Sequence, residues 1–579
     1  MMDQFQTSNA NQNSPIGYVV GGSLKDCLRV RLTVPPQQVQ EGSFVVIDSG
    51  GWLFYGLVTD LQLGATDPRF ADEQTENRLP AEAACLLHGQ TLYTTLEVLP
   101  VLMLEAGPDP ASPDYSAWVA QHPAVGSGHA LPVKTIPAHH APVRLAAEGD
   151  IAQIFGKPGG SNFIIGVTRE QGHDVCVDLG RFVQRSSGIF GATGTGKSFL
   201  TRIILAGLIH HNAASVLLFD MHNEYGYDDT SSDTGQKVAG LKGKFSSRVR
   251  VVGLGAGSMV RGNAPDFHLE IAAGDITPAD IEMLSQELNL RETTASTLDM
   301  LWQSFNRNWF REFRSMRVGA VVDYEDPQTG KTRKIPADDS VAAWANANGA
   351  NVMAAEALHN KLGRLFNKPY IVEQPAADTV GEIIKALGAG QHVILSFGEF
   401  ENDLDYLLVA NLLTRRIRQD WERRTNEFRS GKKGCSEPRP LVVAVEEAHK
   451  LLNRAMAGQT AFATIAREMR KYYVTLLIID QRPSQIYDEV MSQLGTRISG
   501  WLGDEADIQA VLSGLAGRDS LRGMLARLQA KEEVLLLGWG VAMPMPVKSR
   551  RYDDKFYQDL FAGGSPLLTP AQAMKDLGF

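Results

Sequence analysis

The chain has few cysteines for its length and no long apolar run. Its four cysteines, Cys27, Cys85, Cys176 and Cys435, are scattered over 579 residues without disulfide or metal-ligand spacing. This argues against a disulfide framework and fits a reducing cytosol. The longest apolar runs, such as 441–445 and 476–479, fall far short of the roughly 18 residues that a membrane-spanning helix needs. We therefore expect a cytoplasmic protein without a membrane anchor.

An excess of basic residues is also missing. The formal net charge is −10, so any contact with nucleic acid must be a local patch or a lined channel. The N-terminal stretch MMDQFQTSNANQNS has neither the positive nor the apolar region of a signal peptide. Residues 1–14 are therefore expected to form a disordered polar tail.

The first part of the chain predicts a small β-barrel. Short alternating segments such as SFVVID and GWLFYGLVTDLQL are rich in β-branched and aromatic residues and are bounded by glycine. We assign residues 15–145 to this barrel. Within them, residues 106–142 are rich in proline and are expected to form an irregular connection.

The remainder predicts an α/β core with a parallel sheet, built in two parts. Buried strands alternate with helices over residues 146–274 and again over 373–550. Between them, residues 275–372 are expected to form a helical insertion, interrupted by a polar loop at EDPQTGKTRKIPADD. Residues 551–579 are expected to form a C-terminal tail.

The stretch GATGTGKS has the spacing of a phosphate-binding loop and precedes a long apolar-periodic helix. Its glycines permit a backbone that directs several N–H groups at phosphate oxygens, and the N-terminal dipole of the helix adds to the attraction. Lys197 is expected to reach the β- and γ-phosphates, and the Ser198 hydroxyl to ligate Mg²⁺. The expected nucleotide-binding residues are Gly191, Ala192, Thr193, Gly194, Thr195, Gly196, Lys197, Ser198 and Phe199.

Acidic and amide side chains follow other buried strands. Glu446 and Glu447 come directly after the apolar run 441–445, at the carboxyl edge where open α/β sheets bind ligands. Glu446 is expected to hold the Mg²⁺ shell and Glu447 to polarise the attacking water. Gln481 follows the strand expected at 474–480 and could sense the γ-phosphate, although an ordinary loop glutamine is the alternative.

A further polar cluster follows the strand expected at 216–220. It offers Asp220 and Glu224 as groups that could support the site from behind. A simple turn is an equally good interpretation of this cluster.

This ordered series of motifs resembles the HerA branch of the HerA/FtsK ring ATPases. GATGTGKS, LLFDMHNEYG, VEEAHKLL and IAREMRKYYVTLLIIDQRPS follow one another as in that family, and the N-terminal segments are similar to its small barrel. The sequence departs from the family pattern at Glu446, where Asp is common, and at MHN (221–223), where Pro-His-Gly is usual. It also departs at Met469 and Tyr473, where Gly is usual.

The resemblance implies a RecA-like P-loop core and a homohexameric ring with DNA in its central channel. It implies that ATP hydrolysis with Mg²⁺ moves this ring along DNA. It also implies a partner, which is either a nuclease of the NurA type in DNA-end processing or a phage-defence effector such as a Sir2-type NADase or a nuclease. The barrel is the expected docking surface for that partner.

One arginine is expected to act across a subunit boundary. Arg185 lies just before the strand that feeds the phosphate loop, too close in sequence to fold back onto its own γ-phosphate. In a ring it could meet the nucleotide of the neighbouring subunit and neutralise charge on the phosphoryl group. HerA-like proteins typically carry an arginine at this place. Arg467 and Arg470 are the competing candidates, and a surface ion pair is the alternative for Arg185.

The channel should be locally basic even though the chain is acidic. The stretch GLKGKFSSRVR supplies four cations, for which an exposed loop without DNA is the alternative: Lys242, Lys244, Arg248 and Arg250. Contacts from such a loop to phosphates would be salt-dependent and independent of DNA sequence. A second basic helix contains Trp302 and Trp309, which are expected to be core residues, and RRTNEFRSGKK is expected to be a plain exposed loop.

Two other classes of function stay open. The chain could be a scaffold whose ATPase assembles or gates a partner effector with little translocation of its own. It could also be a conjugation or secretion ATPase, although those usually attach to a membrane.

Overall fold

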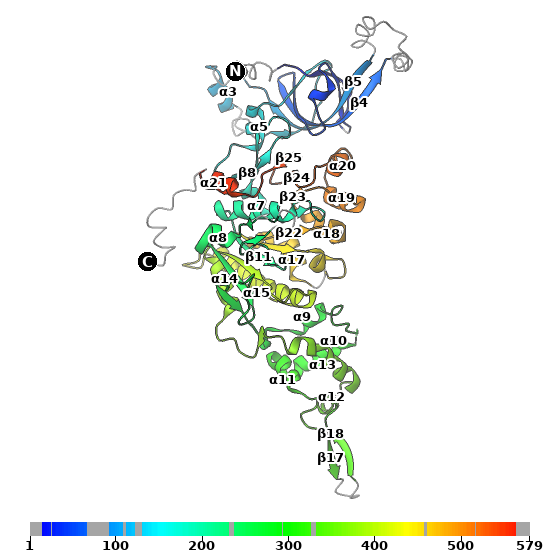
Figure 1. Cartoon of the computed structure of the whole chain (residues 1–579), viewed down its shortest axis with the longest axis vertical. Helices are drawn as coiled ribbons and strands as arrows, with labels where there is room; N and C mark the ends of the chain where they lie inside the picture. The colour runs from blue at the N-terminus through cyan, green and yellow to red at the C-terminus, as the bar shows by residue number, and fades with distance from the viewer. Residues whose placement is uncertain are drawn as a thin grey trace.

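The fold was analysed in a computed structural model. It describes residues 14–66, 92–107, 112–121 and 130–562, apart from positions 25, 231–234, 236, 292, 326–331, 457–459 and 516. The barrel lies at one end of an elongated molecule, the α/β core lies in the middle, and the segment with α9 to α13 lies at the other end (Figure 1). Residues 1–13 of the expected tail, and Cys85, lie outside the described residues. Within the described part, no helix has the length and apolar character needed to cross a membrane.

The expected β-barrel is confirmed. Six antiparallel strands close on themselves because β2 pairs with both β1 and β5, and a short strand, β6, adds to β5. The proline-rich connection is less irregular than expected, since it contains α3 (Tyr115–Gln121) and β6. The strands are β1 (Gly17–Gly22), β2 (Leu28–Leu32), β3 (Phe44–Ser49), β4 (Trp52–Ala65), β5 (Leu92–Glu105), β6 (Leu131–Pro132) and β7 (Pro142–Leu145).

The core is a twelve-stranded sheet in the order β15-β14-β20-β11-β21-β22-β10-β23-β24-β25-β8-β9. Its strands are β8 (Asn162–Val167), β9 (Asp174–Asp178), β10 (Ser187–Phe190), β11 (Ser215–Asp220), β14 (Val249–Leu254), β15 (Phe267–Leu269), β20 (His392–Ser396), β21 (Leu441–Glu446), β22 (Val474–Asp480), β23 (Thr496–Ser499), β24 (Glu533–Gly538) and β25 (Met545–Ser549). The strands expected near 216–220, 441–445 and 474–480 are confirmed.

The expected parallel sheet is confirmed only in part, because the sheet is mixed. The strands from β15 to β23 are parallel, whereas β24, β25, β8 and β9 pair antiparallel. Only six residues separate β24 from β25 and β8 from β9. A parallel crossover needs about a dozen residues or more, so these short connections impose hairpins.

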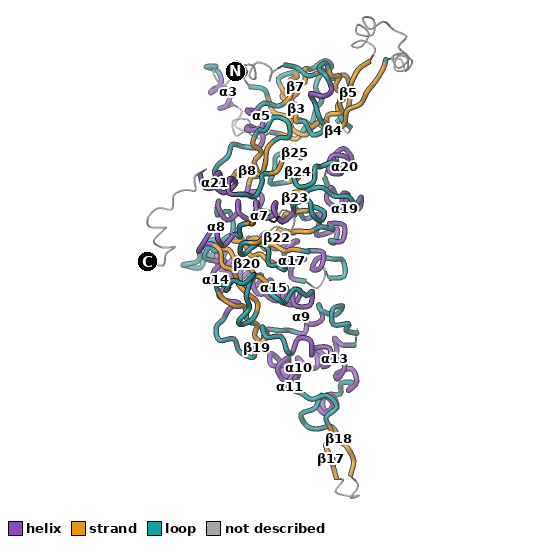
Figure 2. The backbone as a smooth tube through the Cα atoms, in the orientation of Figure 1, coloured by secondary structure: helices purple, strands orange, loops and turns teal. Residues whose placement is uncertain are grey.

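Helices alternate with the parallel strands, as Figure 2 shows, and the longest is α15 with 27 residues. RRTNEFRSGKK is not a plain loop, because α15 continues through it to Arg429. The helices of this part are α5 (Glu148–Phe155), α6 (Leu179–Gln184), α7 (Lys197–His210), α8 (Leu241–Phe245), α14 (Thr379–Gly388), α15 (Asp403–Arg429), α16 (His449–Leu452), α17 (Ala461–Glu468), α18 (Asp488–Gln493), α19 (Glu505–Leu512) and α20 (Arg518–Ala526).

A helical segment leaves the core after β16 (Ile271–Ala272) and returns at β19 (Ile371–Val372), and these two strands pair with each other. Its helices are α9 (Pro278–Met283), α10 (Thr294–Phe305), α11 (Trp309–Ser315), α12 (Val341–Asn348) and α13 (Val352–Phe366). Trp309 is fully buried and Trp302 packs against the core, as expected.

The expected polar loop in this segment is a hairpin instead. Strands β17 (Val321–Glu325) and β18 (Thr332–Pro336) pair antiparallel, and the tip at 326–331 lies outside the described residues. Val321, Val322 and Ile335 supply the β-branched side chains that favour strands.

Two buried carboxylates fasten this segment to α15. Asp405, at the start of α15, accepts from Tyr370 at 2.6 Å and pairs with Lys368 at 2.6 Å. Farther along the helix, Arg415 pairs with Asp280 of α9 at 2.9 Å. The helical segment is therefore bonded to α15 at two levels.

The expected C-terminal tail contains a helix, α21 (Asp554–Ala562). Its Tyr557 and Phe561 rings lie 6.1 and 5.8 Å from the Phe245 ring of α8, and Phe561 also contacts His210 of α7. The apolar spacing of Phe556, Tyr557 and Leu560 places one buried stripe on the core. Residues 563–579 lie outside the described residues.

His392 predicts a specific dependence of stability on pH. Burial lowers the pKa of this histidine to about 3, whereas an unfolded histidine titrates near 6.5. Between these values only the unfolded chain binds the proton, so the free energy of unfolding falls as pH falls, by up to about 1.4 kcal/mol per pH unit. We expect His392→Leu to remove this contribution. Urea midpoints of both proteins between pH 7.5 and 5 measure the effect, and parallel pH profiles would contradict it.

Candidate functional site

The phosphate loop lies between β10 and α7 in the middle of the sheet. Gly194 and Gly196 have φ values of 76° and 89°, a region that side-chain-bearing residues rarely adopt. A side chain at Gly194 would meet open space, so backbone conformation rather than crowding requires glycine there. Thr195 closes the loop from within, because its hydroxyl donates to the carbonyl of Ala192 at 2.7 Å. Helix α7 begins at Lys197, as expected.

Glu446 ends β21 as a buried carboxylate, only 5% exposed. The Tyr225 hydroxyl donates to its Oε1 at 2.8 Å, and the Tyr406 hydroxyl donates to its backbone carbonyl at 2.7 Å. Its Oε2 has no hydrogen-bond partner among the described residues. Burial, with nearby Asp220 and Glu224 adding to it, raises the pKa of Glu446 to about 8. A group with this environment gains from a neighbouring cation.

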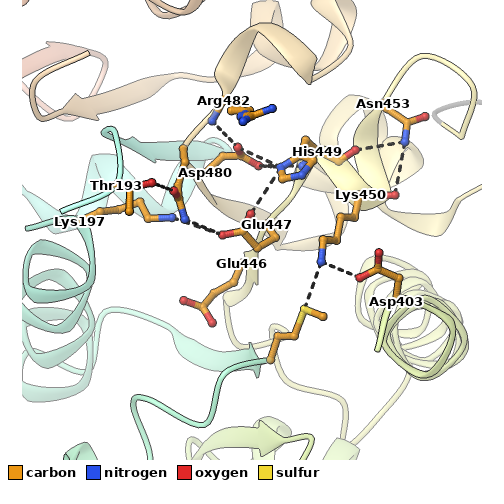
Figure 3. Close-up of polar contacts among 12 residues, drawn as sticks. Thr193, Lys197, Asp403, Glu446, Glu447, His449, Lys450, Asn453, Asp480 and Arg482 are labelled. Atoms are coloured by element: carbon orange, nitrogen blue, oxygen red, sulfur yellow. Dashed lines mark hydrogen bonds and ion pairs between the residues drawn. The ribbon is translucent and has the colours of Figure 1, made fainter. Parts of the chain in front are cut away.

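Glu447 has a backbone φ of 45°, which is uncommon for a residue with a side chain and marks functional sites. Its Oε1 lies 3.8 Å from Lys197 Nζ and accepts from Gln481 Nε2 at 3.0 Å. The Thr193 hydroxyl donates in turn to Gln481 Oε1. Figure 3 shows Thr193 and Lys197 of the phosphate loop beside Glu447, which directly follows β21. The structure thus brings together four residues that the sequence analysis assigned to one site.

Asp480 and His449 were not assigned to the site from the sequence. Asp480 is fully buried at the end of β22, where it accepts from the His449 backbone N–H at 2.8 Å and lies 3.0 Å from His449 Nδ1. This bond to Asp480 raises the pKa of His449, whose ring also lies 3.7 Å from Glu447. The signal was present, since Asp480 directly precedes Gln481 and His449 follows the acidic pair by two positions.

Asp220 has both of the roles considered for its cluster, since it stabilises a turn and also lies near the site. It caps a turn by accepting from the backbone N–H groups of Glu224 and Tyr225 at 2.8 and 3.0 Å. It also lies close enough to Glu446 to influence that carboxyl group, and burial raises the pKa of Asp220 to about 6. Tyr225, which follows it in the same turn, reaches the site directly.

The expected trans-acting arginines lie away from this cluster. Arg185 caps α6 before β10 begins, at the end of the strand opposite the phosphate loop. Its guanidinium lies 4.4 Å from the centre of the Trp539 ring. Arg467 of α17 lies 3.7 Å from Glu489 and is 37% exposed, and Arg470 is also exposed. Among the described residues, none of the three forms a hydrogen bond or ion pair with Lys197 or Glu447 of the same subunit.

The four expected DNA-binding cations are already engaged, and their segment is not the loop that the sequence indicated. It forms α8, a short 3-10 turn and the start of β14. Lys242 pairs with Asp266 at 2.8 Å, Lys244 with Asp554 at 2.9 Å, and Arg250 with Glu382 at 3.0 Å, while Arg248 donates to the carbonyl of Ile209.

The residues fit a nucleoside triphosphate with a divalent cation. Gly194 faces open space, Lys197 supplies a positive charge, and Glu446 offers an oxygen without a partner among the described residues. In the described part of the chain, no three His, Cys, Asp or Glu side chains are placed to hold a metal by themselves. This suits Mg²⁺, which usually binds one or two protein oxygens together with phosphates and water. The fold and site define a P-loop ATPase.

Comparison with known proteins shows which P-loop ATPases this chain is similar to. Residues 163–417 match the family model described as Helicase HerA, central domain. The chain is 24% identical to the DNA double-strand break repair helicase HerA of Sulfurisphaera tokodaii, over 96% of this chain and 95% of that protein. It is 23% identical to the protein of the same name from Sulfolobus acidocaldarius, over 96% of each. These matches support a HerA-type ATPase of the HerA/FtsK superfamily.

Solved structures were also compared. The plasmid coupling protein TrwB in complex with ADP and Mg²⁺ aligns with a TM-score of 0.43 and 13% identity, over 70% of this chain and 93% of that one. VirB4 of Thermoanaerobacter pseudethanolicus aligns with a TM-score of 0.41 and 16% identity, over 68% and 97%.

The site predicts different defects for its charged residues. Glu447→Gln should bind ATP normally but lower kcat by about 10² or more, because an amide cannot take a proton from water as a carboxylate does. Lys197→Ala should lose hydrolysis and also bind ATP more weakly, since the phosphate charge loses its counter-ion. Measurements of equilibrium nucleotide binding and of phosphate release distinguish the defect of Glu447→Gln from that of Lys197→Ala. If Glu446→Gln bound ATP without hydrolysing it while Glu447→Gln stayed active, the two roles would have to be exchanged.

Proposed function

We propose that this chain is an ATP-driven DNA translocase that forms a homohexameric ring with DNA in its central channel. The observation that carries the proposal is the convergence of Lys197, Glu447 and Gln481 at one edge of the sheet. In this arrangement Glu447, the proposed group that acts on water, contacts both Lys197, which is expected to bind phosphate, and Gln481, the proposed sensor of the γ-phosphate. The relatives that match nearly the full chain are named as DNA double-strand break repair helicases, which supports DNA as the substrate of the movement.

The proposed roles in hydrolysis follow from the geometry. The backbone of residues 191–196 and the N-terminus of α7 receive the phosphates of ATP. Ser198 and Glu446 would hold Mg²⁺, which would supply charge that neutralises the phosphates. Lys197 exchanges its Glu447 contact for phosphate oxygens, and this leaves the Glu447 carboxylate free to orient a water and accept its proton. Gln481 bonds both Thr193 of the loop and Glu447, so it can report a change at either.

The ring is needed to bring an arginine to the phosphates. Strand β10 has four residues, or about 13 Å of extended chain, between Arg185 and the phosphate loop. Arg185 therefore serves a neighbouring subunit if it serves any nucleotide, as does Arg467 in the competing assignment. Its guanidinium lies over the Trp539 ring, and no carboxylate within the described ranges forms an ion pair with it.

Mixed rings test this assignment. Arg185→Ala should assemble and bind ATP but hydrolyse it at least about 10³-fold more slowly. Mixing it with Lys197→Ala subunits should restore part of the activity, because one interface then combines an intact loop with an intact arginine. Arg467→Ala in the same mixture is the matched comparison. A mixture as inactive as its parents, with mixed hexamers confirmed by native mass spectrometry, would contradict a trans role for Arg185.

Contact with DNA is proposed for Lys242, Lys244, Arg248 and Arg250, which requires phosphates to displace their present partners. The carboxylates of Asp266 and Asp554 are 32% and 87% exposed in these pairs. Exposed ion pairs contribute little free energy, so exchange for the dense charge of DNA is feasible.

DNA should stimulate the ATPase of the isolated protein, and this stimulation should weaken as salt increases. Lys242→Ala with Lys244→Ala should lower DNA affinity and reduce the slope of its logarithm against log salt by about 2. Lys432→Ala with Lys433→Ala removes the same charge from the exposed segment that follows α15 and serves as the control. An unchanged slope would place the DNA site elsewhere. ATPase activity that ignores DNA but responds to an added partner would favour the scaffold function instead.

The proposed partner is a nuclease of the NurA type or a defence effector, docked on the barrel. The barrel carries exposed apolar side chains, among them Tyr18, Val20, Leu24 and Leu63, which supports it as a docking surface. Co-purification of the partner with the native protein, repeated with variants that lack these exposed apolar side chains, tests the assignment.

A further inference from the structure

We propose that Tyr225 is a positioning residue that presents one oxygen of Glu446 to the divalent cation. The proposal rests on the proposed function, in which Glu446 holds the Mg²⁺ shell. Tyr225 belongs to the turn after β11, which the sequence analysis considered only for its acidic residues. No part of the roles assigned above uses its hydroxyl.

The carboxylate of Glu446 is held asymmetrically. Oε1 accepts the Tyr225 hydroxyl at 2.8 Å, whereas Oε2 is buried and has no partner among the described residues. The backbone carbonyl of the same residue accepts the Tyr406 hydroxyl at 2.7 Å. Two tyrosines on different elements thus fix the main chain and one side-chain oxygen, and only Oε2 is available for another ligand.

Tyr225 is itself fixed by three neighbouring elements. The backbone N–H of Tyr225 donates to Asp220, at the end of β11, at 3.0 Å. The backbone carbonyl of Tyr225 accepts from the N–H of Leu241 in α8 at 2.9 Å. The guanidinium of Arg202, which projects from α7, lies 5.3 Å from the centre of its ring. The ring is fully buried. A side chain held in this way can orient its neighbour without moving on the timescale of catalysis.

This arrangement matches the needs of Mg²⁺, which requires near-ideal octahedral geometry and binds few protein oxygens. A free carboxylate could rotate and offer either oxygen or both. With Oε1 accepting from Tyr225, the carboxylate of Glu446 is held in one orientation, and Oε2 is the oxygen that it offers to a cation. Removing a hydrogen-bond partner of a metal-binding residue typically weakens metal affinity by 10- to 100-fold.

The test measures metal binding rather than turnover. Mn²⁺ is titrated, with detection by electron paramagnetic resonance, into the full-length protein saturated with a non-hydrolysable ATP analogue. Tyr225→Phe should raise the dissociation constant of Mn²⁺ about 10-fold, while binding of the analogue in EDTA stays within about 2-fold of the unmodified protein. Tyr370→Phe is the matched control, because it also removes a buried hydroxyl bonded to a buried carboxylate, that of Asp405. It should leave Mn²⁺ affinity unchanged.

A double-mutant comparison isolates the path through Glu446. Tyr225→Phe should cause no further loss of Mn²⁺ affinity in a Glu446→Gln background, because the hydroxyl acts only through that carboxylate. Additive losses would overturn the proposal. If Glu446→Gln weakens Mn²⁺ binding and Tyr225→Phe does not, the positioning role alone fails. If Glu446→Gln leaves Mn²⁺ affinity unchanged, the proposed metal role of Glu446 fails, and the positioning role fails with it.

A second measurement does not depend on the stability of the Phe variant. Tyr225→3-fluorotyrosine keeps the ring and hydroxyl, and its fluorine resonance should shift when Mg²⁺ is added to the complex with the analogue. The shift should disappear in the Glu446→Gln background. Tyr370→3-fluorotyrosine should give no shift. An unshifted resonance at position 225, or equal shifts at both positions, would overturn the proposal.

Discussion

The register of neighbouring parallel strands determines where the site lies. Phe190, the last residue of β10, pairs with Asp480 at the end of β22, and Ile479 pairs with Glu446 at the end of β21. Because the three strands end at the same level, the phosphate loop, Glu447 and Gln481 emerge at one edge. A shift of one strand by two residues would move its polar terminus by about 7 Å and break the contacts among them.

This alignment places acidic groups in a dry environment, and the structure compensates for them with aromatic hydroxyls. Tyr225 and Tyr406 are fully buried and donate to Glu446, and Tyr370 donates to Asp405. An isolated buried carboxylate costs several kcal/mol, so these hydrogen bonds make the sheet edge tolerable before any cation binds. The tyrosines also make the edge rigid, since large rings in a packed core have few alternative positions.

Much of this could be predicted from the sequence, because the decisive signals are local. GATGTGKS, the apolar runs before Glu446 and Gln481, and the alternating barrel segments each carry their structure within a few residues. The antiparallel part of the sheet could not be predicted, since strand direction there depends on which distant segments pair. Asp480 and Tyr225 were missed for a similar reason: an acid that ends a strand and a tyrosine in a turn acquire their roles only through partners more than 30 residues away. The ion pairs of Lys242 and Lys244 likewise depend on residues far along the chain.

The bonds at the start of α15 connect the nucleotide-binding edge of the sheet to the helical segment. Within one helical turn, Tyr406 holds the Glu446 carbonyl, Asp403 pairs with Lys450 beyond the acidic pair, and Asp405 holds the returning end of the helical segment. That segment carries the β17–β18 hairpin at the extremity of the molecule (Figure 1). A small tilt of this turn about its hydrogen bonds would therefore be magnified along the segment, with the largest displacement at the hairpin. The start of α15 lies beside the nucleotide-binding edge, and the helical segment extends from it away from the barrel (Figure 1).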